Sequence, residues 1–279
     1  RDCLLSRGLG DVYKRQIQEG NGIPADGDLW VAYSVNKEDM WVSRIPVPVQ
    51  IQASAHADDD FSKAGSIAEL TDWNIYSPLW APVTLDGKWL RLQDKDPFDY
   101  AKVERKIPAS KELKISFDLQ AGQNDKGTLQ IDFLDENSIV CSRLELTPDG
   151  IFRAKGGSRF GNLMKYEPGK NYHVEAILSV TDRNIQVFVD GKRVGLRMFY
   201  APVPAIERIA FRTGVPRTFP TVDTPADQTY DLPNAGDQEP LAEYRIANVK
   251  TSSVDKDATA AVLKYADFSH YADYFNGME

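Results

Sequence analysis

The sequence predicts an all-β protein, an antiparallel jelly-roll β-sandwich with an N-terminal β-hairpin and a short C-terminal helix. In residues 112–119 apolar side chains alternate strictly with polar ones, which is the period of a strand with one buried and one wet face. The alternation returns in residues 129–133 and 140–146, and turn-forming residues separate the runs. Short strands joined by short turns indicate antiparallel hairpins.

Further strands are expected on both sides of this central stretch. Residues 172–180 and 185–189 form a hairpin around the turn at 181–184, and Asp190-Gly191 supplies the positive φ that the next tight turn requires. Strand patterns also occupy residues 88–92, 101–106, 206–212 and 243–251. Together these runs predict a sandwich over residues 58–252.

The string I-Q-V-F-V-D-G-K-R-V at residues 185–194 carries a resemblance to a known architecture. It resembles the late hairpin of laminin-G and concanavalin-A-like jelly rolls, and the resemblance covers about residues 58–252. Such domains mostly bind glycans or act as spacers in larger secreted proteins, and a minority are glycanases. The resemblance therefore implies an extracellular or periplasmic location and a polysaccharide or glycan as partner.

Composition and charge exclude several classes of function. The formal charge of −8 argues against nucleic acid or an anionic membrane as partner, because both require concentrated Lys and Arg. No run of about 18 apolar residues occurs, so no transmembrane helix is expected. The only two cysteines, Cys3 and Cys141, exclude a disulfide scaffold. Strand alternation predicts that Cys141 is a free thiol on the more polar strand face.

The N-terminal part divides into three predicted segments. Residues 1–16 resemble translated sequencing-adapter read-through and are expected to be a disordered artefact, with a genuine flexible leader as the alternative. Residues 17–50 contain a hairpin that resembles the closing blade of sialidase-like β-propellers of the BNR-repeat type, although the blade signature S-x-D-x-G-x-T-W is absent. A lone hairpin is marginal in water, so we expect the tail of a truncated propeller, or else a piece that docks on the sandwich, followed by a linker at 51–57.

Two later segments stand apart from the strand pattern. Residues 215–240 are rich in proline and poor in apolar side chains, which is typical of a functional or disordered insertion. Residues 253–279 are expected to be a linker and an amphipathic helix at 259–276, the start of a truncated further domain.

Large aromatic residues gather at the start of the predicted sandwich. Aromatic rings can stack on the apolar face of a sugar, although in a sandwich they more often belong to the core. One or two of these five residues are expected to line a ligand site: Trp73, Tyr76, Trp80, Trp89 and Tyr100.

Three aspartates between two predicted strands suggest a possible cofactor. Asp94, Asp96 and Asp99 could offer oxygen ligands to Ca²⁺, which takes six to eight of them. Related jelly rolls often bind calcium. The alternative is a turn that Asp96 initiates together with Pro97.

One strand has the format of a jelly-roll glucanase motif. The motif E-[I/L/V]-D-x-x-E, in which the first Glu attacks the sugar and the last protonates the leaving oxygen, aligns with residues 130–135. Gln130 occupies the nucleophile position, and an amide cannot form the glycosyl ester. Asp135 is shorter than the Glu it would replace. We interpret Gln130, Asp132 and Asp135 as ordinary strand alternation.

The sequence thus favours a non-catalytic carbohydrate-binding or spacer module of a secreted, multidomain, sialidase-like glycan-degrading protein. Its other expected partners are the missing propeller and C-terminal domains of the same chain. Two alternatives remain open: a catalytic glycoside hydrolase or polysaccharide lyase domain, and a purely structural domain that packs on a propeller.

Overall fold

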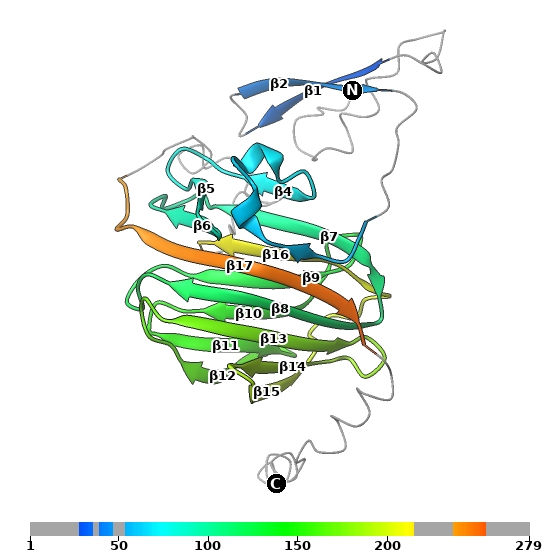
Figure 1. The fold of residues 1–279 in the computed structure, drawn as a ribbon, viewed down its shortest axis with the longest axis vertical. Coiled ribbons are helices and arrows are strands. Elements are labelled where there is room, and N and C mark those ends of the chain that lie inside the picture. The colour runs from blue at the N-terminus through cyan, green and yellow to red at the C-terminus, as the bar shows by residue number, and fades with distance from the viewer. Residues whose placement is uncertain (1–27, 36–38, 47–53, 215–236, 255–279) are drawn as a thin grey trace, which may run out of the picture.

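The computed structural model describes residues 28–35, 39–46, 54–214 and 237–254 (Figure 1). Apart from two short 3₁₀ helices, η1 (Phe61–Lys63) and η2 (Ile67–Glu69), the regular structure of these residues is β-strand. The strands form two large antiparallel sheets and one separate hairpin. The predicted all-β sandwich is therefore confirmed. In the described part of the chain, no helix is both long and apolar enough to cross a membrane.

The first sheet has seven strands. Their spatial order is β12 (Arg159–Lys165), β11 (Ile151–Gly156), β10 (Val140–Leu146), β9 (Leu129–Leu134), β16 (Ile206–Thr213), β7 (Lys102–Ser110) and β4 (Trp73–Tyr76). The central strand β9 pairs with both β10 and β16, with Asp132 opposite Arg143 on one side and Ala210 on the other.

The second sheet follows the order β15 (Lys192–Met198), β14 (Asn184–Val189), β13 (Asn171–Ser179), β8 (Glu112–Ala121), β17 (Ala242–Ser253), β6 (Trp89–Asp94) and β5 (Val83–Asp86), and the short β3 (Asp58–Asp59) pairs beside β17. Including β3, this sheet has eight strands. The separate hairpin joins β1 (Asp28–Val35) to β2 (Asp39–Pro46).

Most of the predicted strands are confirmed, including the hairpin at 28–46. The structure adds strands that the sequence pattern had not revealed, among them β4, β5 and β12. β4 and β5 have only four residues each, and Gly161 interrupts the pattern of β12, so the alternation from which strands are recognised is weak in all three. The predicted helix at 259–276, residues 1–16 and most of the proline-rich segment lie outside the described residues.

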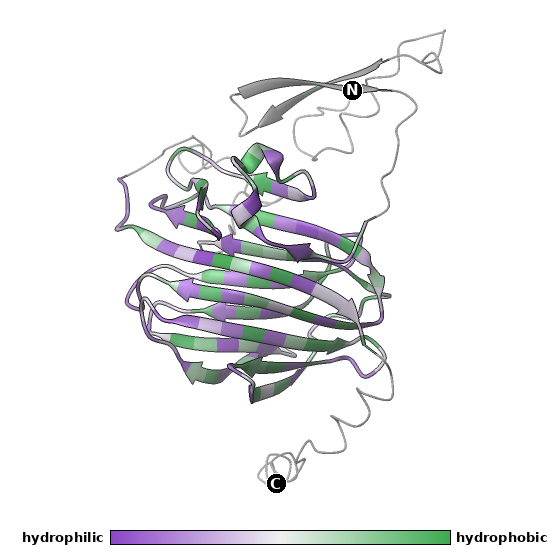
Figure 2. Cartoon of the chain, in the orientation of Figure 1, coloured by the Kyte–Doolittle hydropathy of each residue, from purple (hydrophilic) through white to green (hydrophobic). Residues whose placement is uncertain are grey.

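The core lies between the two large sheets. Along β8 buried and partly exposed residues alternate without a break, and Figure 2 shows the matching alternation of hydrophobic and hydrophilic stripes on the strands. Phe117 of β8 meets Phe211 of β16 edge to face, with ring centroids 5.1 Å apart. Both side chains are fully buried. This contact links the middle strands of the two sheets, and edge-to-face pairs add stability beyond their buried area.

Cys141 corrects one expectation. The alternation of β10 predicted a thiol on the more polar face, but the structure buries Cys141 completely within the hydrophobic core. The cause is a register shift between Val140 and Ser142, where a β-bulge interrupts the alternation. Burial raises the pKa of the Cys141 thiol to about 12, so the thiol stays protonated and is a poor nucleophile.

A tight turn connects β6 to β7 through hydrogen bonds of its aspartates. The backbone N–H of Asp96 donates to Asp94 Oδ1 at 2.9 Å, and those of Phe98 and Asp99 donate to Asp96 Oδ1 at 2.9 and 2.8 Å. Asp94 is buried, and this desolvation raises the pKa of its carboxyl from 3.8 to about 6, because burial disfavours the charged form.

The pKa of Asp94 predicts how stability depends on pH. The folded-state pKa of Asp94 lies above the ordinary value, so the folded protein binds this proton more tightly than the unfolded chain does. The resulting contribution to the free energy of unfolding is complete below about pH 4 and is lost as the pH rises through about 6. Asp94→Asn keeps the acceptor oxygen and removes the charge. We expect it to raise the free energy of unfolding by up to about 3 kcal/mol at pH 8 and to change it little at pH 4. Urea unfolding at both pH values measures this, and equal effects at the two would contradict it.

The edge-to-face contact in the core gives a second prediction. Phe117→Ala leaves a cavity beside Phe211 and should lower the free energy of unfolding by about 3–5 kcal/mol. Leu79→Ala is the control, since the side chain of Leu79 is 77% exposed and its removal should cost less than about 0.5 kcal/mol. Thermal and urea unfolding of both variants would measure the difference, and similar losses would show that the inter-sheet contact is not central.

Candidate functional site

Charged and polar side chains collect on the outer face of the seven-stranded sheet. Because strand residues alternate between faces, the positions next to the inward residues Ile131 and Phe211 point away from the core. The register places Gln130 between Glu145 and Arg212. We call this surface the polar face, made up of Lys102, Glu104, Gln130, Asp132, Arg143, Glu145, Arg153, Lys155, Phe160, Arg208 and Arg212.

The centre of the polar face is a half-buried ion pair. The guanidinium of Arg143 binds the carboxylate of Asp132 with two hydrogen bonds, Nε to Oδ1 at 2.6 Å and Nη2 to Oδ2 at 2.8 Å. Although burial opposes it, this pairing with Asp132 raises the pKa of Arg143. Two parallel hydrogen bonds fix both the position and the orientation of the guanidinium plane.

The other two carboxylates of the polar face are also paired. Glu145 accepts a hydrogen bond from Arg153 Nε at 2.8 Å, and the amide of Gln130 donates to it at 3.3 Å. Glu104 accepts from Lys102 Nζ at 2.6 Å and from Arg208 Nη1 at 3.1 Å. Gln130 is buried, and its Oε1 atom has no hydrogen-bond partner among the described residues. A water or a ligand hydroxyl would satisfy this acceptor.

Aromatic rings and cations alternate along the margin of the polar face. Arg153 lies over the ring of Phe160 at 4.2 Å, and Lys155 Nζ lies 4.1 Å from the ring centroid of Tyr200 and 6.0 Å from that of Phe160. At the opposite margin, Arg212 lies 3.8 Å over Tyr100. Each distance is within the range of cation–π attraction.

The hydroxyl of Tyr200 is an uncharged group beside this margin. Burial raises the pKa of Tyr200 to about 12, so its hydroxyl remains protonated at physiological pH. The margin therefore offers ring faces, cations and a neutral hydroxyl in close proximity.

The structure brings two of the five predicted aromatic residues together. Tyr76 and Tyr100 lie 5.3 Å apart at the β4 margin of the polar face, and the hydroxyl of Tyr76 donates to Asp99 at 2.8 Å. Trp73 is buried, packs against Phe61 and donates its indole N–H to Asp59. A buried indole offers no free face to a sugar in this state.

The two remaining tryptophans lie away from the polar face. Trp80 lines a separate groove, and Trp89 begins β6 in the other sheet, where Lys88 Nζ lies 5.1 Å from its ring centroid. The ligand role of the five aromatics stays a prediction.

The three predicted calcium ligands serve the turn described above. Their carboxylates accept hydrogen bonds from backbone N–H groups at 2.8–2.9 Å, Asp94 from Asp96, Asp96 from Phe98 and Asp99, and Asp99 from Tyr100. Across the described residues, no group of three or more His, Cys, Asp or Glu is arranged to hold a metal ion. The geometry thus favours the turn that Asp96 and Pro97 were expected to form, and calcium binding stays a prediction.

The positions that align with a glucanase motif are engaged in structural contacts. Asp132 is held by Arg143, and Asp135 is buried with its Oδ1 atom accepting the backbone N–H groups of Asn137 and Ile139. Gln130 is held by Glu145. Neither carboxylate is placed as a free nucleophile or acid, which agrees with interpreting this strand as ordinary alternation.

Several residues of the polar face and its margin escaped the sequence reasoning, among them Arg153, Lys155, Phe160 and Tyr200. The first two follow from a local signal, since Ile151-Phe152-Arg153-Ala154-Lys155 alternates and puts both cations on one face. Phe160 and Tyr200 had no such signal. Phe160 lies in β12, where Gly161 interrupts the pattern, and Tyr200 lies after β15 in a connection.

Comparison with known proteins adds a family and a fold. The family described as "Sialidase-like, CBM domain", where CBM denotes a carbohydrate-binding module, matches residues 73–228, more than half of the chain. A solved structure named "Sialidase" is 85% identical over 95% of this chain, with a TM-score of 0.74. This chain covers 24% of that protein's length. No curated protein sequence matches the chain.

More distant structures share the fold alone. Apo Crh5 transglycosylase has 10% identity and a TM-score of 0.52, covering 73% of this chain and 86% of its own. A protein from a study of endo-acting O-glycanases that members of the human gut microbiota express to initiate mucin breakdown has 11% identity and a TM-score of 0.50, covering 71% and 98%. The family match includes β9, β10, β11 and β16, which carry most of the polar face. The chain therefore belongs to the sialidase-like carbohydrate-binding module family.

Proposed function

We propose that the polar face is the glycan-binding surface of this module and that its ligand is an anionic glycan. The main support is the charge of the face. Its strands project the cations Lys102, Arg143, Arg153, Lys155, Arg208 and Arg212 and the carboxylates Glu104, Asp132 and Glu145. On a chain with a formal charge of −8, this local excess of cations favours a ligand that carries carboxylate or sulfate groups.

Lys155 is the residue on which the proposal depends most. Its ammonium lies between the rings of Tyr200 and Phe160, and no carboxylate pairs with it among the residues that the structure describes. A sugar ring placed beside these aromatic rings would bring its acid group within reach of the ammonium. The apolar contact and the charge would then act on the same ligand.

The ion pairs of the polar face fix the conformation of its side chains, and the paired carboxylates do not bind the ligand directly. Asp132 fixes Arg143, and Glu145 fixes Arg153, so two guanidinium groups are oriented before any glycan arrives. A preorganised site loses less conformational entropy on binding. These contacts support a binding surface more than a catalytic one.

The proposed biological setting is a larger, secreted, glycan-degrading protein. This chain covers only about a quarter of the sialidase that it resembles, so catalysis would belong to the remainder of such a protein. We propose that the hairpin at 28–46 continues a propeller and that the module keeps the enzyme on its substrate in the extracellular or periplasmic space. A module that raises the local substrate concentration needs no catalytic residues of its own.

Substitution of Lys155 tests the ligand class. Isothermal titration with 3′-sialyllactose, chondroitin sulfate and polygalacturonate, compared with neutral lactose, should show tighter binding of at least one anionic glycan and weaker binding at higher salt. Lys155→Met should weaken that binding about tenfold or more, because it removes a charged hydrogen-bond donor.

Lys192→Met is the matched control, since Lys192 is an exposed lysine of the other sheet, and it should leave the affinity unchanged. Equal affinity for lactose and all three anionic glycans would contradict the charge argument. An unchanged affinity in Lys155→Met would contradict the location.

A further inference from the structure

A groove lies away from the polar face, between the loop before β5, the end of β6 and the segment that enters β17. Its volume is about 430 Å³, including the part open to solvent. The lining mixes apolar and polar side chains: Leu79, Trp80, Pro82, Gln93, Lys95, Gln238 and Leu241.

Backbone hydrogen bonds fix the walls of this groove. The N–H of Lys95 donates to the carbonyl of Trp80 at 2.9 Å, and the N–H of Glu239 donates to the carbonyl of Lys95 at 2.8 Å. The N–H of Gln93 donates to the carbonyl of Pro82 at 3.0 Å. Three segments distant in sequence are thereby joined, so the groove exists before any ligand binds.

One wall of the groove exposes large apolar side chains to solvent. Leu79 is 77% exposed and Leu241 is 37% exposed, and both rank among the few large hydrophobic residues exposed in the described part of the chain. Trp80 lies beside them and is half-buried. Apolar side chains that converge in a concave site, with a few polar groups, are typical of small-ligand sites.

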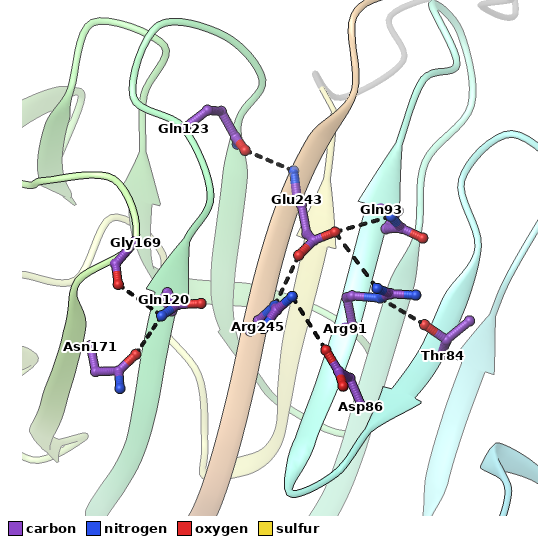
Figure 3. Close-up of polar contacts among 10 residues, drawn as sticks. All are labelled: Thr84, Asp86, Arg91, Gln93, Gln120, Gln123, Gly169, Asn171, Glu243 and Arg245. Carbon is purple, nitrogen blue, oxygen red and sulfur yellow. Dashed lines mark hydrogen bonds and ion pairs between the residues drawn. The ribbon is translucent and has the colours of Figure 1, made fainter.

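The polar groups are suited to sugar hydroxyls. Figure 3 shows Gln93 beside Glu243, to which its amide donates a hydrogen bond of 3.0 Å, and Glu243 in turn contacts Arg91 and Arg245. This network holds the Gln93 amide in place. Gln238 adds a second, exposed amide.

We infer that this groove is a second carbohydrate subsite, which takes an uncharged pyranose residue. The apolar C–H face of the sugar would pack against Trp80 and Leu241, and its hydroxyls would bind the amides of Gln93 and Gln238. Among the described residues that line the groove only Lys95 is charged, and Lys95 is exposed to solvent, so apolar and amide groups make up most of the lining. The groove lies on the other sheet, and its role does not depend on that of the polar face.

Isothermal titration calorimetry of the full chain tests this inference with three neutral disaccharides: lactose, N-acetyllactosamine and cellobiose. At least one should give a saturable change in the parent chain and in Trp89→Ala. Trp80→Ala should weaken that binding tenfold or more. Trp89 is the control because it lies in β6 of the same sheet but outside the groove.

Two further variants separate the possible explanations. Gln238→Ala alters an exposed side chain, so it should weaken binding at least threefold without lowering the melting temperature, even if Trp80→Ala fails to fold. Lys155→Met should leave neutral-sugar binding intact, which separates this site from the polar face. The inference is overturned if none of the three sugars gives a saturable signal, or if Gln238→Ala and a folded Trp80→Ala bind as the parent does.

Discussion

The structure depends on the packing of the two large sheets against each other. Along the central strands, side chains that point into the core alternate with side chains that point to solvent. Phe117 and Phe211 meet edge to face at the middle of this interface, 5.1 Å apart. Since one face of each strand must be apolar to form the core, its charged residues are directed to the other face. The polar face is thus a consequence of the fold's periodicity, and the side chains in the outward positions decide what the module can bind.

The second constraint is the cost of buried charge. Asp132, Glu145 and Glu104 are all buried on the outer side of the seven-stranded sheet, and an unpaired carboxylate there would be strongly destabilising. Each is therefore matched to at least one cation. Lys155, which pairs with none of these carboxylates in the described part of the chain, is the basis of the proposed preference for anions. The same strands thus carry both the ion pairs that stabilise the fold and the residues of the proposed binding surface.

The fold could be predicted from sequence because alternation and turn residues are local signals, and they are strong in β8, β9 and β13. The site could not, because it depends on register: β11 and β12 bring Lys155 and Phe160 together, and Tyr200 reaches them from a connection after β15. The surroundings of Trp73 depend on tertiary packing in the same way. Composition identified Trp73 as a candidate, but only the packing against Phe61 shows that it belongs to the core. A strict period of two likewise does not predict the β-bulge that buries Cys141.

The central claim is that an anionic glycan binds the outer face of the seven-stranded sheet. The most direct measurement is the change in backbone amide NMR shifts when a chondroitin sulfate hexasaccharide or 3′-sialyllactose is added to the labelled chain. The account predicts the largest changes in β9, β10, β11 and β16, around Asp132, Arg143, Lys155 and Arg212. Saturable binding of either ligand whose shift changes fall only on the eight-stranded sheet would contradict it.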